Sequence, residues 1–228
     1  MSGTLYLVAT PIGNLQDITL RALETLRDVD IIACEDTRHT LRLLNHFEIK
    51  KPLISYYKGK EYEGAEKIIN LLLQDKNVAL VSDAGMPCIS DPGSILVNKV
   101  MEQGLKHTVI PGACAFVSAA TLTGLDGAFT FVGFLPEKKK DKDKLLSPFI
   151  NAPAKLIFYA APHDINKTLS YLYDILGDRK VYLVKEITKM YENIIFGQLK
   201  SLQLDDPKGE FVIIVEEAKI EKTELEEV

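Results

Sequence analysis

The chain has 228 residues, a hydrophobic content of 46%, 26% charged residues and a formal net charge of −5 at pH 7. This length suits one large domain or two small ones, and the composition is that of a globular protein with a sizeable core. The negative charge excludes a protein that holds nucleic acid through charge alone, although it leaves room for local basic patches.

No apolar run reaches the roughly 18 residues that a membrane-spanning helix needs, and no basic-then-apolar leader opens the chain. We therefore expect a cytoplasmic protein without a membrane partner. The cysteines Cys34, Cys88 and Cys114 are irregularly spaced, which excludes a simple disulfide framework, and no CxxC or HxxxH pair indicates zinc. We expect no bound metal and three buried structural thiols. The alternative is a reactive Cys114 at the start of a helix.

The first half alternates between strand-like and helix-like segments. The strand-like runs are LYLVA at 5–9, DIIACE at 30–35, PLISYY at 52–57, NVALVSD at 77–83 and HTVI at 107–110. In one of the segments between them, Ala65, Ile68, Ile69 and Leu72 form an apolar face at helical spacing. Near-continuous apolar strands that alternate with helices predict a parallel sheet with helices on both faces.

The second half begins with a helix-like segment, CAFVSAATLTG, and has a different strand pattern. Three strand-like runs follow the helix-like segment at 165–176 with no helix between them, which is typical of antiparallel neighbours. All five runs are FTFVGFL at 129–135, KLIFYA at 155–160, KVYLVKEI at 180–187, NIIFGQL at 193–199 and EFVIIVEE at 210–217. We therefore expect two α/β domains, an N-terminal one with a parallel sheet at 1–112 and a C-terminal one with a mixed sheet at 113–218. The acidic tail at 219–228 is expected to be solvated and partly disordered.

Unusual loops follow four of the predicted strands in the first half. Ligands of an open parallel sheet bind outside the carboxyl ends of its strands. Each loop alone could be a tight connection, because Gly, Pro, Asn and Asp are turn residues. If the sheet is parallel, all four lie at one edge, which favours a ligand site there. The loops are TPIGNLQDIT at 10–19, EDTRHT at 35–40, SDAGMPCISDPG at 82–93 and IPGACA at 110–115.

The chemistry of these loops does not match a phosphate site. The first loop lacks G-x-G-x-x-G, and Pro11 removes a backbone donor, so the loop offers carbonyls to a neutral or cationic ligand. Thr19 or Asp17 can cap the helix that follows. In the third loop, Asp83 or Asp91 can accept hydrogen bonds from a ligand, and the alternative for Asp91 is a helix cap.

Two charged segments have both a structural and a functional interpretation. In EDTR, a helix N-terminus would stabilise Glu35 and Asp36 as anions, and a buried pair of Asp36 with Arg38 is an alternative. His39 is expected to be exposed. The run EKKKDKDK at 137–144 is either a solvated helix face or a patch that contacts nucleic-acid phosphates.

Several motifs, in this order and spacing, resemble a known family. LYLVATPIGNLQDIT, CEDTRHTLRLL, VALVSDAGMPCISDPG, PGACA, FVGFLP and KEITKMYE are similar to the bacterial 16S ribosomal RNA (cytidine-2′-O)-methyltransferases, from about Leu5 to Glu216. These are S-adenosylmethionine-dependent enzymes of the tetrapyrrole methylase superfamily. The resemblance implies a cofactor folded into a cleft between two α/β domains. The implied cofactor-binding residues are Pro11, Ile12, Gly13, Asp83, Ala84, Gly85, Cys114, Ala115, Tyr159 and Ala160.

The resemblance also implies the reaction and its partners. The expected activity is 2′-O-methylation of a cytidine ribose in the RNA of the small ribosomal subunit, by a homodimer. Glu35, Asp36 and Glu186, with Lys185 beside it, are candidates for the catalytic groups, because they are polar residues at predicted strand ends. Arg38 and Asn14 are expected to orient the RNA, and Arg38 is also a candidate catalytic residue.

The sequence departs from the family pattern in three places. PGACA stands where the family has PGPSA, which puts Cys114 in place of a serine, and YAAPHD stands for YESPHR, which places Ala160 and Asp164 there. The small helical domain that often follows VIIVEE is not expected. Two alternatives therefore stay open: a methylase of the same superfamily that acts on a tetrapyrrole or another small molecule, and a protein that binds the cofactor without catalysis.

Overall fold

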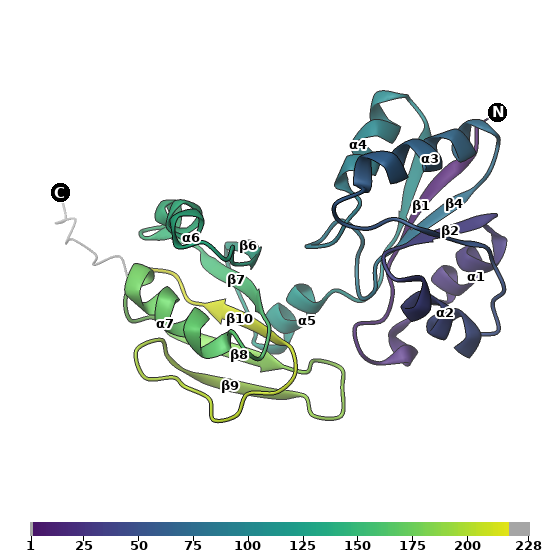
Figure 1. The fold of residues 1–228 in the computed structure, drawn as a ribbon. Coiled ribbons are helices and arrows are strands. Elements are labelled where there is room, and N and C mark those ends of the chain that lie inside the picture. The colour runs from purple at the N-terminus through teal and green to yellow at the C-terminus, as the bar shows by residue number, and fades with distance from the viewer. Residues whose placement is uncertain (1, 219–228) are drawn as a thin grey trace, which may run out of the picture. The chain divides into compact units, whose positions relative to one another are not determined.

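The computed structural model describes residues 2–218, which divide into two compact units (Figure 1). The first unit ends at Cys114 and the second begins at Ala115, and each has its own sheet and its own core. The expected acidic tail at 219–228 lies outside the described residues. Within residues 2–218, no helix is both long and apolar enough to cross a membrane.

The sheet of the first unit contains five strands, all parallel, in the order β3-β2-β4-β1-β5. This confirms the parallel sheet predicted from the apolar runs. The strands are β1 (Thr4–Val8), β2 (Ile31–Cys34), β3 (Leu53–Ser55), β4 (Val78–Val81) and β5 (Lys106–Ile110).

Helices cover both faces of this sheet, as predicted. Leu26 and Leu44, from the first two helices, pack on one face, and Ile68 and Leu96, from the next two, pack on the other. The helices are α1 (Leu20–Asp28), α2 (Thr37–His46), α3 (Glu61–Leu73) and α4 (Ser94–Glu102), and the short 3-10 helix η1 (Leu15–Asp17) precedes α1.

Side-chain caps explain where two of these helices begin. The hydroxyl of Thr19 accepts a hydrogen bond from the Ala22 N–H at 3.0 Å, which confirms one of the two expected caps of α1. The expectation that Asp91 could cap α4 is wrong. Helix α4 begins at Ser94 after Gly93, whose φ of 146° suits glycine, and no side chain caps it.

The second unit has a mixed five-stranded sheet in the order β6-β7-β10-β8-β9, as expected from its three consecutive strand-like runs. Strands β6 and β7 are parallel, and the other neighbours are antiparallel. Strand β10 lies between β7 and β8 and not beside β9, the strand that precedes it in the chain. The strands are β6 (Phe129–Phe134), β7 (Lys155–Ala160), β8 (Lys180–Lys185), β9 (Asn193–Gln198) and β10 (Phe211–Val215).

The two faces of this second sheet are covered differently. Leu146 and Leu169, from α6 and α7, belong to the core on one face. On the other face α5 lies against β7 and β10, and its Phe116 ring stacks on Phe131 with the centroids 4.3 Å apart. The helices are α5 (Ala115–Leu122), α6 (Lys139–Leu146), the 3-10 helix η2 (Ser147–Phe149) and α7 (Ile165–Leu176).

Candidate active site

The loops after β1 and β4 are joined by hydrogen bonds between their main chains. The Thr10 N–H donates to the Gly85 carbonyl at 2.9 Å, and the Gly85 N–H donates to the Thr10 carbonyl at 3.1 Å. The Thr10 hydroxyl also donates to the Ser82 carbonyl at 3.1 Å. Thr10 and Ser82 are buried, and these bonds satisfy their polar groups. The two loops therefore form one braced edge of the sheet.

Glycines allow a third loop, the one after β5, to join this edge. Gly85 has a φ of 80°, and a Cβ there would lie 3.2 Å from Ile12 Cγ2 and 3.6 Å from the Ala113 carbonyl oxygen. A Cβ on Gly112 would lie 2.8 Å from the Cβ of Ala9. A side chain at Gly112 would therefore collide with Ala9, and one at Gly85 would crowd Ile12 in a backbone conformation that favours glycine, so the loops after β1, β4 and β5 meet closely.

The position of this edge in the sheet topology is typical of a ligand site. Strands β1 and β4 are neighbours, but the connection after β1 leads to β2 on one side and the connection after β4 leads to β5 on the other. Ligands of open α/β sheets bind at such a switch point, outside the carboxyl ends of the strands. The expected cofactor residues Pro11, Ile12, Asp83 and Gly85 all lie there.

Carboxylates give this edge a negative charge. Burial first, and then the charge of Asp83, raises the pKa of Glu35. Burial, together with the charges of Glu35 and Asp83, raises the pKa of Asp91 to about 6. Burial and the neighbouring carboxylates thus both disfavour the ionised forms of these acids. A cationic ligand would be stabilised here. Within residues 2–218, no three His, Cys, Asp or Glu side chains are arranged to hold a metal.

Asp36, next to Glu35 in the chain, has a different environment. Its carboxylate accepts the Arg38 N–H at 2.8 Å, as the N-cap of α2, and pairs with the Arg38 guanidinium at 2.9 and 3.2 Å. The Arg38 side chain lowers the pKa of Asp36 to about 2. The pair is exposed, with 86% of the Arg38 side chain accessible, so the alternative of a buried pair is wrong. His39 is exposed, as predicted.

The three cysteines do not share one environment. Cys34 is buried, as expected, but Cys88 and Cys114 are half-buried, so the expectation of three buried thiols is wrong for these two. Burial and the neighbouring acids raise the pKa values of Cys34 and Cys88, which disfavours their reactive thiolate forms. Cys114 ends the first unit, and Ala115 begins α5.

In the second unit, the remaining predicted residues share one edge of the mixed sheet. Phe211, the first residue of β10, pairs with Ala160 at the end of β7 and with Lys185 at the end of β8, so Glu186 lies one residue beyond. The Tyr159 hydroxyl accepts the Phe116 N–H at 3.2 Å.

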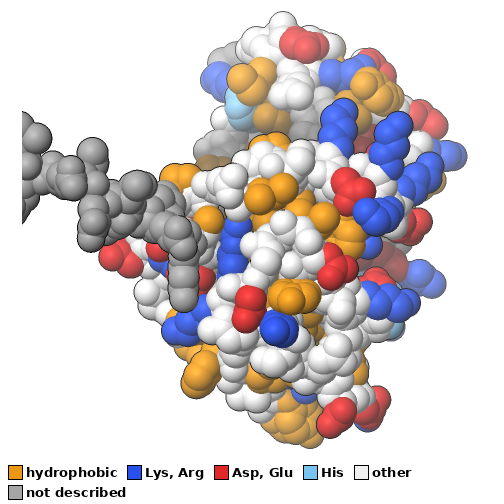
Figure 2. Space-filling model, turned by 90° about the vertical axis from the view of Figure 1, so that its left-hand side faces the viewer, with side chains coloured by type: hydrophobic (Ala, Val, Ile, Leu, Met, Phe, Trp, Pro, Cys, Tyr) orange, Lys and Arg blue, Asp and Glu red, His pale blue; other side chains and the backbone are white. Residues whose placement is uncertain are grey.

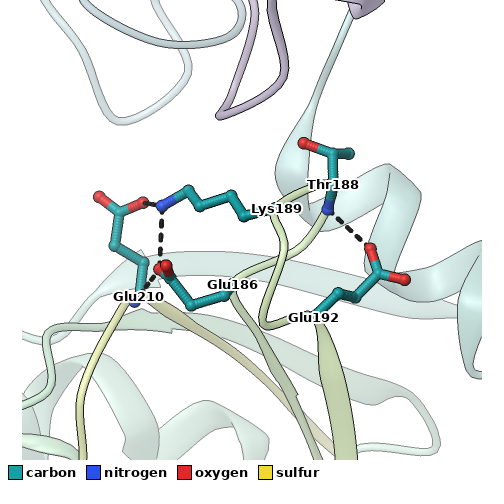
Figure 3. A network of polar contacts seen from close by, with 5 residues as sticks. All are labelled: Glu186, Thr188, Lys189, Glu192 and Glu210. Atoms are coloured by element: carbon teal, nitrogen blue, oxygen red, sulfur yellow. Dashed lines mark hydrogen bonds and ion pairs between the residues drawn. The ribbon is translucent and has the colours of Figure 1, made fainter.

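Glu186 belongs to a network that braces the turn between β8 and β9 (Figure 3). Its Oε1 accepts hydrogen bonds from Lys189 Nζ and from the Glu210 N–H, both at 2.9 Å, and Lys189 also pairs with the Glu210 carboxylate at 2.8 Å. Burial alone would raise the pKa of Glu186, but these contacts outweigh burial and lower it. The carboxylate is therefore engaged within the turn, and its predicted catalytic role stays a prediction.

The same turn holds two residues in a costly backbone conformation. Glu186 and Thr188 have φ values of 50° and 64°, and a β-branched residue such as Thr188 rarely adopts such a φ. The Thr188 N–H donates to Glu192 at 2.6 Å, while its buried hydroxyl has no partner within residues 2–218. Sequence reasoning missed this strain, because no residue type in KEITKMYE signals it. It also missed Asp91 as a titrating group, although the crowding of acids in SDAGMPCISDPG and EDTR was a usable signal.

Comparison with curated proteins gives close relatives over the whole chain. The chain is 46% identical to Ribosomal RNA small subunit methyltransferase I of Mesomycoplasma conjunctivae, covering 100% of this chain and 98% of that one. It is also 46% identical to the protein of that name from Halalkalibacterium halodurans, covering 99% of this chain and 80% of that one. For the Bacillus subtilis protein the identity is 44%, with coverage of 99% and 79%.

Solved structures with the same fold are more distant in sequence. The methyltransferase CobJ has a TM-score of 0.72 at 17% identity, and 95% of each chain is covered. A uroporphyrin-III C-methyl transferase from Thermus thermophilus, complexed with S-adenyl homocysteine, has a TM-score of 0.65 at 19% identity, with coverage of 94% and 97%. These similarities confirm the expected two-sheet α/β fold.

The model of the family Tetrapyrrole (Corrin/Porphyrin) Methylases matches residues 4–203, which include the whole first sheet with its loops and strands β6 to β9 of the second sheet. With relatives more than 40% identical along nearly its full length, the chain belongs to the tetrapyrrole methylase family and, within it, to the ribosomal RNA small subunit methyltransferase I proteins.

Proposed function

We propose that this protein transfers a methyl group from S-adenosylmethionine to the ribose 2′-hydroxyl of a cytidine in 16S ribosomal RNA. The observation that carries this proposal is the 46% identity, across the whole chain, to a protein named for small-subunit ribosomal RNA methylation. The family match and the fold it shares with a methyltransferase that binds S-adenyl homocysteine support the cofactor.

The residues at the edge of the first sheet suit this cofactor chemically. S-adenosylmethionine carries a sulfonium cation and no phosphate, and when bound it supplies an electrophilic methyl group. Pro11 has no N–H to offer, and the carboxylates of Asp83, Glu35 and Asp91 favour positive charge. Gly85 lets the main chains approach closely. We propose that the residues that hold the cofactor are Pro11, Ile12, Gly13, Asp83, Ala84, Gly85, Cys114, Ala115, Tyr159 and Ala160.

The carboxylates of this edge differ in how well they accept a proton. A ribose hydroxyl is a weak acid, so an acceptor whose pKa lies nearer neutrality helps more than a strongly acidic one. Glu35 and Asp91 have raised pKa values, whereas Asp36, with a pKa of about 2, and Glu186 are held as anions by their partners. We infer that Glu35 is the catalytic acceptor and that Asp36 and Glu186 position the loops that carry the site.

Positioning of the hydroxyl is expected to supply the largest part of the rate, because the displacement needs alignment. The exposed guanidinium of Arg38, held by Asp36, and the side chain of Asn14 would orient the RNA. The resemblance further implies a homodimer, and we include it in the proposal together with the cytoplasmic location expected from the sequence.

A methyl-transfer assay tests this function. Purified protein is incubated with isotopically labelled S-adenosylmethionine and isolated small ribosomal subunits, and the RNA is digested to nucleosides for mass spectrometry. We expect labelled 2′-O-methylcytidine, with less transfer to deproteinised RNA, because a chain of net charge −5 has little non-specific grip on a bare polyanion. Transfer to a tetrapyrrole and not to subunits would support the small-molecule alternative. Cofactor binding without transfer to either would support a protein without catalysis.

A further inference from the structure

Helix α6 carries most of the basic run identified in the sequence. Residues 137–144, EKKKDKDK, have a net charge of +2 in a chain whose net charge is −5. The run forms the N-terminal arm and the first turns of α6. Lysine and arginine side chains also gather along one side of the face drawn in the space-filling view (Figure 2). The lysines of α6 do not all have the same surroundings, and this difference separates a structural role from a binding role.

One side of α6 is fixed to α7 through Tyr171. Lys139, Lys142, Asp143 and Leu146 are spaced i, i+3, i+4 and i+7, so they share one side of the helix. The Tyr171 hydroxyl donates to the Asp143 carboxylate, and the amino groups of Lys139 and Lys142 lie 5.8 and 5.1 Å from the centre of the Tyr171 ring. Leu146 is fully buried. We call this side the inner face.

The contacts of the inner face engage its charged side chains. Lys139 Nζ pairs with Asp143 at 2.9 Å, and the hydrogen bond from Tyr171, followed by the contact with Lys139, lowers the pKa of Asp143. Lys142 faces an aromatic ring, a favourable position for an ammonium group. The two lysines of the inner face are therefore engaged within the protein.

The opposite side of α6, the outer face, carries Lys140 and Lys144. At about 100° per residue these two lysines lie more than a quarter turn from the centre of the inner face, and their i, i+4 spacing stacks them on adjacent turns. Lys138 precedes the helix as its N-cap. All three are exposed, and residues 2–218 provide no ion pair or hydrogen bond for their amino groups. Asp141, which follows Lys140 in the chain, lies in the first turn, where the helix dipole stabilises it.

We propose that the outer face of α6, formed by Lys140 and Lys144 with Lys138 at its end, binds backbone phosphates of the ribosomal RNA substrate. This inference rests on the proposed function. A protein of net negative charge needs a local basic surface to approach a polyanion, and phosphate contacts set orientation without reading sequence. Because α6 is clamped to α7, its outer lysines are presented on a fixed support and lose less freedom on binding than lysines of a loose loop.

Two double variants with the same change of charge test the proposal. Lys140→Gln with Lys144→Gln removes the outer lysines, and Lys139→Gln with Lys142→Gln removes the inner ones. Binding to small subunits and to protein-free 16S RNA is measured over a range of salt concentrations. The outer variant is expected to bind both about tenfold or more weakly at low salt, with a salt slope reduced by about 1.4 to 1.8 for two lost phosphate contacts. The inner variant is expected to keep the salt slope of the wild-type protein and to melt at a lower temperature.

The outcomes separate this proposal from the proposed function. If the wild-type protein methylates subunits and the outer variant has the same salt slope and the same KM, the proposed phosphate contact is wrong. The proposed function would be unaffected by that result. Weaker binding of the outer variant to subunits, but unchanged binding to protein-free RNA, would assign the surface to a ribosomal protein and also overturn the proposal. S-adenosylmethionine affinity is expected to be equal in all three proteins, because α6 lies outside the residues assigned to the cofactor.

Discussion

The main chains of Thr10 and Gly85 exchange two hydrogen bonds, of 2.9 and 3.1 Å, between the loops that follow β1 and β4. The bridge joins neighbouring strands whose onward connections leave in opposite directions. It depends on glycine, because a Cβ on Gly85 would lie 3.2 Å from Ile12 in a backbone conformation with φ of 80°. This bridge is therefore one of the contacts that set the shape of the proposed cofactor site.

Replacing Gly85 is expected to abolish cofactor binding. In Gly85→Val the side chain would crowd Ile12 and the carbonyl of Ala113 and so separate the three loops. Gly85→Ala is expected to weaken S-adenosylmethionine binding at least tenfold. Isothermal titration calorimetry with the purified, folded variants measures both effects.

Gly127→Ala is the matched control for backbone strain. Gly127 has the same φ of 80°, and a Cβ at this position would have nothing within 4 Å. Its replacement is expected to cost about 1 to 2 kcal/mol of stability from the left-handed conformation alone, with unchanged cofactor affinity. If a folded Gly85→Val protein binds S-adenosylmethionine with wild-type affinity, the assignment of Gly85 to the cofactor site is wrong.

Glu35 and Asp36, although adjacent, are expected to respond differently to neutral substitution. Glu35→Gln removes the proposed proton acceptor and should lower the rate of methyl transfer at saturating cofactor by roughly 10²- to 10⁴-fold. It should also weaken cofactor binding, because the site loses a negative charge that favours a cation. Asp36→Asn keeps a residue that can cap α2, so a small loss of stability and a modest change in rate are expected. Single-turnover assays at saturating cofactor compare the two.

The pH profile checks the role of Glu35 independently. Burial and the charge of Asp83 raise its pKa, so transfer by the wild-type enzyme should fall as the pH drops through that raised value and the carboxyl gains a proton. The acidic limb should be absent from the residual activity of Glu35→Gln. Wild-type activity in Glu35→Gln, or an unchanged acidic limb, would exclude Glu35 as the acceptor.

Asp91→Asn is expected to stabilise the protein at neutral pH. The folded-state pKa of about 6 lies above the ordinary 3.8, so the folded state disfavours the carboxylate. The contribution of Asp91 to stability is therefore greatest below the ordinary pKa and declines as the pH rises from there through about 6. The gain for Asp91→Asn at pH 8 is on the order of 1 to 2 kcal/mol after allowance for solvent screening.

Denaturant titrations at pH 8 and near pH 4 measure this gain, which should shrink towards zero at the lower pH. The same variant should bind S-adenosylmethionine more weakly at pH 8, because the site loses a negative charge that favours a cation. A variant that is less stable than wild type at pH 8 would show that the carboxylate has a stabilising partner.

Lys189 is expected to hold the turn between β8 and β9. Lys189→Met would leave the carboxylates of Glu186 and Glu210 without their shared cation, in a turn that already holds Glu186 and Thr188 at positive φ. A loss of stability on the order of 1 kcal/mol is expected, with faster amide hydrogen exchange across 187–192. Lys208→Met is the control, because Lys208 pairs with Asp206 on the open surface, where ion pairs contribute little. Equal exchange in both variants would contradict the bracing role.

Local pattern was sufficient to predict the strands and helices, but not the order of the second sheet. Largely apolar runs of four to eight residues marked all ten strands of residues 2–218, with ends within two residues or so, because the cores of both sheets are built from these runs. The place of β10 between β7 and β8 depends on pairing between distant segments such as Ile213 with Phe158 and Leu183, which no local motif encodes.

The candidate site was predictable as a group of loops, but not in the roles of its acids. Glu35 and Asp36 are equivalent in the motif EDTR, yet one is half-buried near Asp83 and the other faces Arg38 at the surface, so their pKa values move in opposite directions. Likewise, Asp91 precedes a helix in the sequence, but Gly93 takes the N-cap position, and the carboxyl is left among other acids. These outcomes depend on burial and on neighbours that only the folded chain defines.

The most direct test of the central claim is a comparison of small-subunit RNA from cells with and without this gene. The RNA is digested to nucleosides, and 2′-O-methylcytidine is measured by mass spectrometry. We expect this nucleoside to be lost in the deletion strain, restored by the wild-type gene and not restored by a gene carrying Gly85→Val. Equal amounts of 2′-O-methylcytidine in the presence and absence of the gene would contradict the proposed function.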